Sequence, residues 1–292
     1  MIYRIVHITT YKYKSIVSVG NYVAYLTPRT LIQRQLARSE LLIQPPPATR
    51  SERLDYFGNL LCLFTIQEPH MELTVEARSE VIMKGRSTPW PQQSPPWEEA
   101  AGLLFNDQSP AGLKAYQFGF ESPRIRLRPE FASYAHQSFT YQRPMHEGLL
   151  DLTARIHSDF RFDKKVTSVR TPVEEVFRKR RGGYEDFAHL QIACLRSVNV
   201  AARYVCGYRG IDLTLSRPRP AKADAPHAWV SAYCPRIGWL DMDPTDNLTP
   251  SNSHVTLAWG RDSSDVIPLR GSILGGDAHT LRVTVDIEAL DF

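Results

Sequence analysis

The spacing of apolar side chains changes once along this chain, at a proline-rich segment near residue 90. Before that segment, apolar and polar residues alternate with a period of two, as in Tyr11 to Lys14 and Glu72 to Val81. Such alternation is typical of strands with one buried face. Gly58 and Asn59 separate two of these runs, and both residue types tolerate the positive φ angles of a tight hairpin. Residues 1–84 are therefore predicted to form an antiparallel β domain.

Beyond the proline-rich segment the pattern becomes helical. Leu149, Leu152 and Ile156 lie at helical spacing, and Glu185 to Val198 is apolar around most of its circumference. A helix with that pattern is predicted to be buried on nearly all sides. Consecutive strands follow it, which include His227 to Tyr233 and Trp239 to Asp243.

The two patterns together predict an α+β protein, because the helices and the strands occupy separate stretches of sequence. We expect an N-terminal β domain at residues 1–84 and a proline-rich linker and connecting segment at 85–130. A core domain, with a buried helix packed on an antiparallel sheet, is expected at 131–292.

Charge gives no indication of a nucleic-acid or membrane partner. The net charge is only +4, from 35 basic and 31 acidic side chains. The basic run Arg178 to Arg181 lies at the expected end of a helix, where the helix dipole favours cations. The N-terminus lacks the apolar segment of a signal peptide, and no apolar run approaches the length of a membrane span. A cytoplasmic location is the resulting expectation.

The cysteines indicate reduced thiols rather than a metal site or a disulfide framework. Cys62, Cys194, Cys206 and Cys234 form no CxxC pair. Asp186 and His189 are three residues apart on the predicted helix, but no third ligand is evident near them, so a structural role is favoured. We expect no metal and no organic cofactor.

One group of residues has the pattern of thiol-based acyl transfer, which requires a nucleophile, a base and a carboxylate that orients the base. Gly182 and Gly183 precede Tyr184 at the start of the buried helix. His227 heads one predicted strand and Asp243 ends the next, so the two side chains can face each other across the ladder.

These residues carry a resemblance to a known family. The run Arg181 to Leu190 resembles the bacterial transglutaminase-like motif R-G-x-C-x-D-F-A-H-L, and the likeness extends in order along nearly the whole chain, through Ala202 to Tyr208, Asp224 to Trp229, Asp243 to Thr245 and Gly260 to Asp262. The first domain is similar to the N-terminal β region of the same family. The resemblance implies a papain-like or transglutaminase-like core at 131–292. It also implies a Cys-His-Asp triad, with His227 as the base and Asp243 as the orienting acid.

The nucleophile position departs from the family pattern, because Tyr184 stands where the motif has cysteine. A phenol has a pKa near ~10 against ~8.5 for a thiol, and it is bulkier. We therefore expect an inactive binding or scaffold protein that takes a peptide or protein ligand. The alternative is an active amide hydrolase or acyl transferase with a relocated nucleophile, for which Cys206 is a candidate. The Tyr184 hydroxyl is predicted to lie within hydrogen-bond reach of His227. The oligomeric state stays open.

Overall fold

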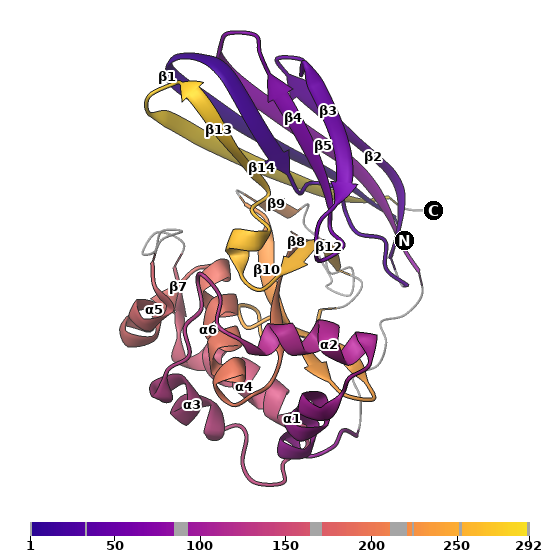
Figure 1. Cartoon of the computed structure of the whole chain (residues 1–292), viewed down its shortest axis with the longest axis vertical. Coiled ribbons are helices and arrows are strands. Elements are labelled where there is room, and N and C mark those ends of the chain that lie inside the picture. Colours follow the sequence, from indigo (N-terminus) through magenta and orange to yellow (C-terminus); the bar gives the residue numbers. More distant parts are fainter. Residues whose placement is uncertain are drawn as a thin grey trace.

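The computed structural model describes residues 2–32, 34–84, 93–163, 171–210, 221–223, 225–250 and 253–290. Figure 1 shows a β-sheet domain on one side and a mixed core of helices and strands on the other. The expected α+β class is confirmed. None of the helices in these ranges combines the length and the apolar composition that crossing a bilayer requires.

Within the described residues, the β domain is built on an eight-stranded antiparallel sheet. Its strands are β1 (Ile2–Ala24), β2 (Arg34–Gln44), β3 (Thr49–Leu54), β4 (Leu60–Ile66), β5 (His70–Met83), β9 (Ala221–Ala223), β13 (Leu269–Gly275) and β14 (His279–Leu290). The period-two alternation predicted this burial correctly, since Leu73, Val75 and Ala77 in β5 are at most 3% exposed.

Strand β1 organises the sheet because its two halves have different neighbours. Its first half pairs with β5 and β14, and its second half pairs with β4 and β13. The register shifts around Val17, where one partner set gives way to the other. Irregular register of this kind bends a strand and increases its twist, and the sheet curves strongly in Figure 1.

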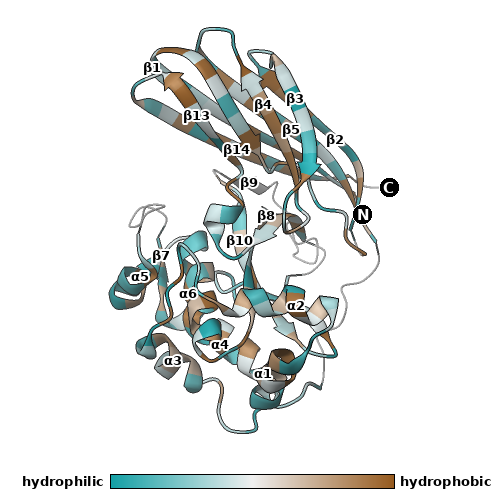
Figure 2. Cartoon of the chain, in the orientation of Figure 1, coloured by the Kyte–Doolittle hydropathy of each residue, from teal (hydrophilic) through white to brown (hydrophobic). Residues whose placement is uncertain are grey.

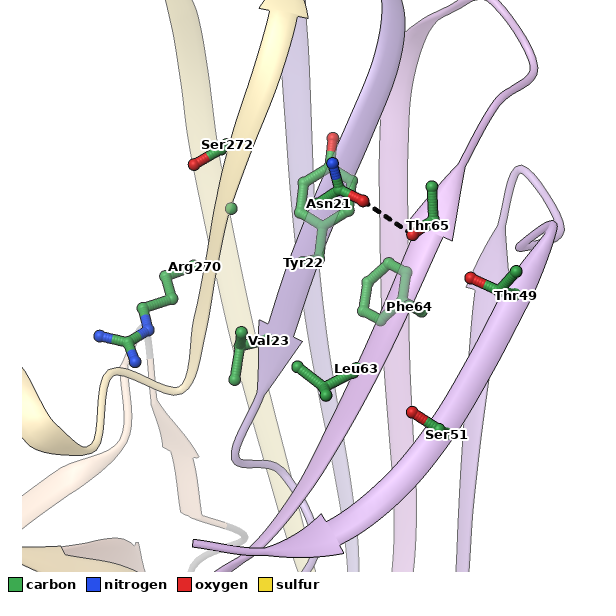
Figure 3. A pocket seen from close by; sticks show the side chains of 11 residues that line it. Asn21, Tyr22, Val23, Thr49, Ser51, Leu63, Phe64, Thr65, Arg270 and Ser272 are labelled. Carbon is green, nitrogen blue, oxygen red and sulfur yellow. Dashed lines mark hydrogen bonds between the residues drawn. The ribbon is translucent and has the colours of Figure 1, made fainter.

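The two faces of the second half of β1 differ in environment. Tyr22 stacks on Phe64 in a buried apolar cluster. On the opposite face, Thr65 donates a 2.8 Å hydrogen bond to the side-chain oxygen of the exposed Asn21. Figure 3 shows these residues around a pocket of about 480 Å³ on β1, β3, β4 and β13. This pocket belongs to the β domain alone.

In the part of the chain that the structure describes, the core domain packs six helices around a four-stranded antiparallel sheet of order β11-β10-β8-β12. The helices are α1 (Trp97–Asn106), α2 (Pro110–Tyr116), α3 (Pro129–His136), α4 (Met145–Asp159), α5 (Val173–Lys179) and α6 (Tyr184–Ser197). The sheet strands are β8 (Ala202–Arg209), β10 (His227–Cys234), β11 (Gly238–Met242) and β12 (His254–Gly260). Two 3₁₀ turns, η1 (Gln117–Gly119) and η2 (Ser263–Asp265), and a short parallel pair, β6 (Arg161–Phe162) with β7 (Arg181–Gly182), complete it.

Helix α6 is the centre of this domain. Every residue from Asp186 to Arg196 is buried, as the sequence pattern predicted. In Figure 2 the hydropathic colouring shows apolar stretches on α6 between the surrounding helices. A helix buried on all sides holds its first residue in a fixed position relative to the sheet.

The structure differs from the predicted domain limits in the C-terminal part of the core and in the linker. Strands β13 and β14 pair with β1, so residues 269–290 belong to the β domain rather than to a core at 131–292. The described part of the predicted linker carries helices α1 and α2. Ala100 and Leu104 of α1 and Ala115 of α2 are buried in apolar clusters. Residues 85–92 lie outside the described ranges. Local periodicity shows that a strand exists, but it does not show which distant strand will pair with it.

A stack of cations and indoles in the core is joined by Arg29 of the β domain. The guanidinium of Arg29, which follows β1, lies 3.5 Å from the ring centre of Trp259 in β12. Arg203 lies 3.8 Å from the same ring and 3.9 Å from that of Trp239. Such contacts contribute ~0.5–2 kcal/mol each, and more when they exclude water. The Arg29–Trp259 contact therefore helps to fix the β domain to the core.

Candidate functional site

Tyr184 is the first residue of α6, and the local sequence explains why the helix begins there. Gly183 donates its backbone N–H to the Asp186 carboxylate at 2.7 Å, which closes the first turn. A Cβ atom on Gly182 would lie 2.6 Å from Cβ of Asp186, so only glycine fits. Acidic side chains in a first turn also complement the helix dipole. Residue 184 is thereby held at the tip of the buried helix.

The ring of Tyr184 lies between two other rings. It contacts the imidazole of His227 edge to face, with 4.4 Å between ring centres and 76° between planes. On its other side Phe162 lies 4.6 Å away between ring centres. The structure thus brings residues 184 and 227 into contact. A hydrogen bond from the Tyr184 hydroxyl to His227 stays a prediction.

His227 and Asp243 form a buried pair. Nε2 of His227 lies 2.5 Å from Oδ2 of Asp243, and the two side chains are 6% and 0% exposed. An ionised carboxylate can only accept hydrogen bonds, so the proton of this bond is assigned to Nε2 of His227. Nδ1 is the ring nitrogen that does not bond to Asp243. The register pairs Val230 with Met242, which places Asp243 diagonally across the ladder from His227.

Asp243 accepts hydrogen bonds on both oxygens. Oδ1 accepts from the backbone N–H groups of Thr245 and Asp246, at 3.0 and 3.4 Å. Oδ2 accepts from His227 and also from Nε2 of His254, at 3.4 Å. Burial alone would raise the pKa of this carboxyl, but the bonds from the two imidazoles hold the pKa well below its usual range. Asp243 is therefore an ionised group with a fixed orientation.

His254 is the site residue that the sequence analysis missed. It opens β12 and is fully buried, and burial lowers its pKa, so the ring is neutral. Ser253 Oγ lies 3.1 Å from Nδ1 of His254 and can donate to it. The proton of the neutral ring is then on Nε2, which donates to Asp243. The available signal was a histidine at the head of an otherwise apolar strand, the same pattern that identified His227.

These three residues are also the group in the described ranges that could hold a metal ion, since their ligand atoms lie within 4.8 Å of one another. Zinc bound tetrahedrally at about 2.0–2.2 Å needs ligand atoms about 3.3 Å apart. The 2.5 Å separation between His227 and Asp243 is a hydrogen-bond distance instead. The arrangement is that of a hydrogen-bonded cluster.

Asp186 and His189 lie three residues apart on α6, a spacing that could in principle suit a metal ion. Both side chains have structural roles instead. The Asp186 carboxylate caps α6 as described above. Nε2 of His189 accepts from the backbone N–H of Ser263 at 3.1 Å, and burial lowers its pKa to about 4. A neutral imidazole that accepts a backbone hydrogen bond ties α6 to the chain segment that leaves β12.

A cleft of about 470 Å³ opens beside Tyr184, between the two domains. The core supplies the start of α6, parts of β8 and β10, and the segment that leads into β13. The β domain supplies side chains from β1 and β14. The lining side chains on these two strands are His7, Thr9, Tyr11, Leu281 and Val283. Sequence analysis did not assign them to a site, because they lie far from the motif along the chain.

Comparison with known proteins identifies the family. Residues 3–82 match the bacterial transglutaminase-like N-terminal region, and residues 132–244 match the transglutaminase-like superfamily. An uncharacterized protein of Mycobacterium tuberculosis is 36% identical over 297 residues, covering 98% of this chain and 92% of its own. The chain belongs to the bacterial transglutaminase-like proteins. The family resemblance found in the sequence is thereby confirmed.

Other relatives agree with this assignment. An uncharacterized protein of Mycobacterium leprae is 27% identical to this transglutaminase-like chain, and the match covers 98% of both proteins. A crystal structure of a proposed cysteine protease from Cytophaga hutchinsonii superposes with a TM-score of 0.74 at 22% identity, over 100% of this chain and 92% of the other. The two-domain fold is therefore shared along the entire chain.

Proposed function

We propose that this transglutaminase-like protein does not catalyse acyl transfer and uses its cleft to bind a peptide or protein segment. The observation that supports this proposal is the ring of Tyr184, which lies against His227 at the tip of α6. In the family motif a thiol occupies that position. The rest of the arrangement, an imidazole oriented by a buried carboxylate, is retained.

Chemistry and space both argue against Tyr184 as a nucleophile. A phenol titrates near ~10 and is a weaker nucleophile toward an amide carbonyl than a thiolate. A reacting carbonyl carbon must approach to about 3–3.5 Å. The Tyr184 ring, packed between Phe162 and His227, fills the space next to the imidazole where that carbon would have to lie.

The second candidate, an amide hydrolase with a relocated nucleophile, has one observation in its favour, because Cys206 lines the cleft. Its environment opposes that role. The side chain is 4% exposed in the interior of β8, and burial followed by the charge of Glu185 raises its pKa to about 12. A thiol with that pKa is protonated at neutral pH and lacks the activation that a helix N-terminus provides. Burial likewise raises the pKa of Cys194 and Cys234.

The test is restoration of the thiol by Tyr184→Cys. Wild-type and variant protein are incubated with iodoacetamide near neutral pH, and alkylation is located by mass spectrometry. Hydrolysis of p-nitrophenyl acetate is followed in parallel. We expect wild-type protein to show neither rapid alkylation nor turnover. Tyr184→Cys should gain a thiolate at the helix tip, with alkylation at residue 184 and ester hydrolysis above background.

A matched control is Tyr184→Cys combined with His227→Asn, which keeps the thiol and removes the base. Its alkylation should fall to the rate of an ordinary thiol. Stoichiometric alkylation of Cys206 in the wild-type protein, together with turnover that Cys206→Ser abolishes, would overturn the proposal and support the relocated nucleophile.

A further inference from the structure

We infer that the cleft selects peptide segments by an uncharged apolar side chain, and that the β domain supplies the selecting surface through Tyr11, Val283 and Leu281. This inference rests on the proposed function and adds the class of ligand. It assigns to the N-terminal region a direct part in recognition.

The selecting surface is a two-stranded patch on β1 and β14. The antiparallel register places Tyr11 opposite Leu281 and Thr9 opposite Val283. Residues directly opposite each other in a ladder project from the same face. Leu281 is 53% exposed, and Tyr11 and Val283 are half-buried, so apolar surface on this patch remains uncovered. Covering such surface is favourable by ~25 cal/mol per Å².

Further into the cleft, the polar atoms of this wall are already paired. Nδ1 of His7 lies 2.8 Å from the Tyr208 hydroxyl, and Nε2 lies 3.0 Å from Oγ1 of Thr9. Burial lowers the pKa of His7 to about 4, so the imidazole is neutral at neutral pH. The Tyr11 hydroxyl donates to the carbonyl of Leu269 at 3.3 Å. None of the described side chains that this wall contributes to the cleft offers a charge to a ligand.

The facing wall has carboxyl groups that are also engaged. Glu185 accepts a hydrogen bond from the Ser263 hydroxyl at 2.5 Å, and burial raises its pKa. Asp186 accepts from the backbone of Gly183. Among the described side chains that line the cleft there is no lysine or arginine. An acidic ligand would therefore meet two carboxyl groups without a compensating cation.

A basic ligand is disfavoured for a different reason. It would have to give up much of its own hydration to reach the half-buried Glu185, whose carboxyl is already engaged by Ser263, and that cost commonly exceeds the attraction within such a pair. Apolar residues dominate the rest of the lining, as they do in most small-ligand sites, and the volume of about 470 Å³ is of the usual size. A peptide with a large apolar side chain fits both the shape and the charge.

Binding of blocked tripeptides tests this inference on the full chain. The probes are acetyl-Ala-Phe-Ala-amide and its counterparts with Gln, Lys or Glu in the central position. Dissociation constants and the shifts of leucine and valine methyl signals are measured by NMR. We expect the Phe peptide to bind at least ~10-fold more tightly than the other three, the size of effect that one good apolar contact gives. The shifted methyl signals should include Leu281 and Val283.

Two matched variants place the effect on the proposed surface. Leu281→Asp should weaken binding of the Phe peptide ~10-fold or more. Leu274→Asp, at a 68% exposed leucine of β13 that does not line the cleft, should leave it unchanged. Equal or tighter binding of a charged or Gln peptide, no binding of any probe, or equal effects of the two variants would each overturn the inference.

Failure of this inference is distinguishable from failure of the proposed function. Each probe is also examined by mass spectrometry after incubation with the protein. A cleaved or deamidated probe contradicts the non-catalytic proposal, whatever the order of affinities. Intact probes with the wrong order of affinities contradict only the apolar selection.

Discussion

The side-chain amide of Asn59 forms two hydrogen bonds with the backbone of Trp259, 200 residues further along the chain. Its Nδ2 donates to the Trp259 carbonyl at 2.8 Å, and its Oδ1 accepts from the Trp259 N–H at 3.0 Å. The Asn59 side chain thus bonds both the N–H and the C=O of one residue in β12, as the backbone of a neighbouring strand would. Only Gly58 of the predicted Gly58-Asn59 turn has positive φ, whereas Asn59 links the two domains.

Asn59→Ala should destabilise the whole chain rather than the hairpin alone. Asn59 is fully buried, and its removal leaves the backbone groups of Trp259 and a hydrogen of Arg29 without this partner. Each unsatisfied buried group costs ~1–3 kcal/mol, so we expect a loss of about 3 kcal/mol in the free energy of unfolding, measured in urea. Asn21→Ala, which removes an exposed hydrogen bond in the same domain, should cost much less. Similar losses for the two variants would contradict a bridging role for Asn59.

The stability of the fold should fall with acid between pH 6.5 and 4. His7 and His189 are buried, and burial lowers both pKa values to about 4, against an ordinary value near ~6.5 in the unfolded chain. In that window the unfolded chain binds more protons, so the stabilisation is present above the unfolded pKa and is lost as pH falls toward the folded pKa. Each residue contributes a slope of up to ~1.4 kcal/mol per pH unit.

The measurement is the free energy of unfolding in urea across this pH range. His189→Gln should reduce the slope by about one proton, because glutamine does not titrate. The exposed His136→Gln serves as the control and should leave the slope unchanged. Equal slopes for all three proteins would show that proton uptake by His189 does not accompany unfolding.

His254 is expected to act through Asp243 as a positioning residue. Its neutral ring donates to the same carboxylate oxygen that receives His227. In the Tyr184→Cys background, adding His254→Gln should leave the Asp243 carboxylate less firmly oriented. The alkylation rate of residue 184 at pH 7 should then fall by ~10-fold, which is the loss commonly seen when a residue that orients a site residue is replaced.

The pH profile of alkylation separates positioning from simple damage to the fold. The profile of the double variant should move toward that of an ordinary thiol near ~8.5. If His254→Gln lowered the unfolding temperature but left the pH profile of alkylation unchanged, His254 would support the fold and not the orientation of Asp243.

The sequence by itself determined the elements whose pattern is local. Alternation predicted β5, and an apolar circumference predicted the burial of α6. The positions of His227 and Asp243 on consecutive strands were enough to expect their contact, because the short turn between those strands limits their register. The substitution at Tyr184 was likewise visible in the motif alone.

Tertiary structure decided the features that depend on distant segments. Strand β14 pairs with β1, although the two strands lie near opposite ends of the sequence. No periodicity within either strand specifies the other as its partner. The same pairing carries His7 and Leu281 to the cleft. His254 reaches Asp243 although it opens β12, which lies at the opposite edge of the core sheet from β11. Side chains meet there because separately predictable elements pack against one another, and packing is a property of the assembled chain.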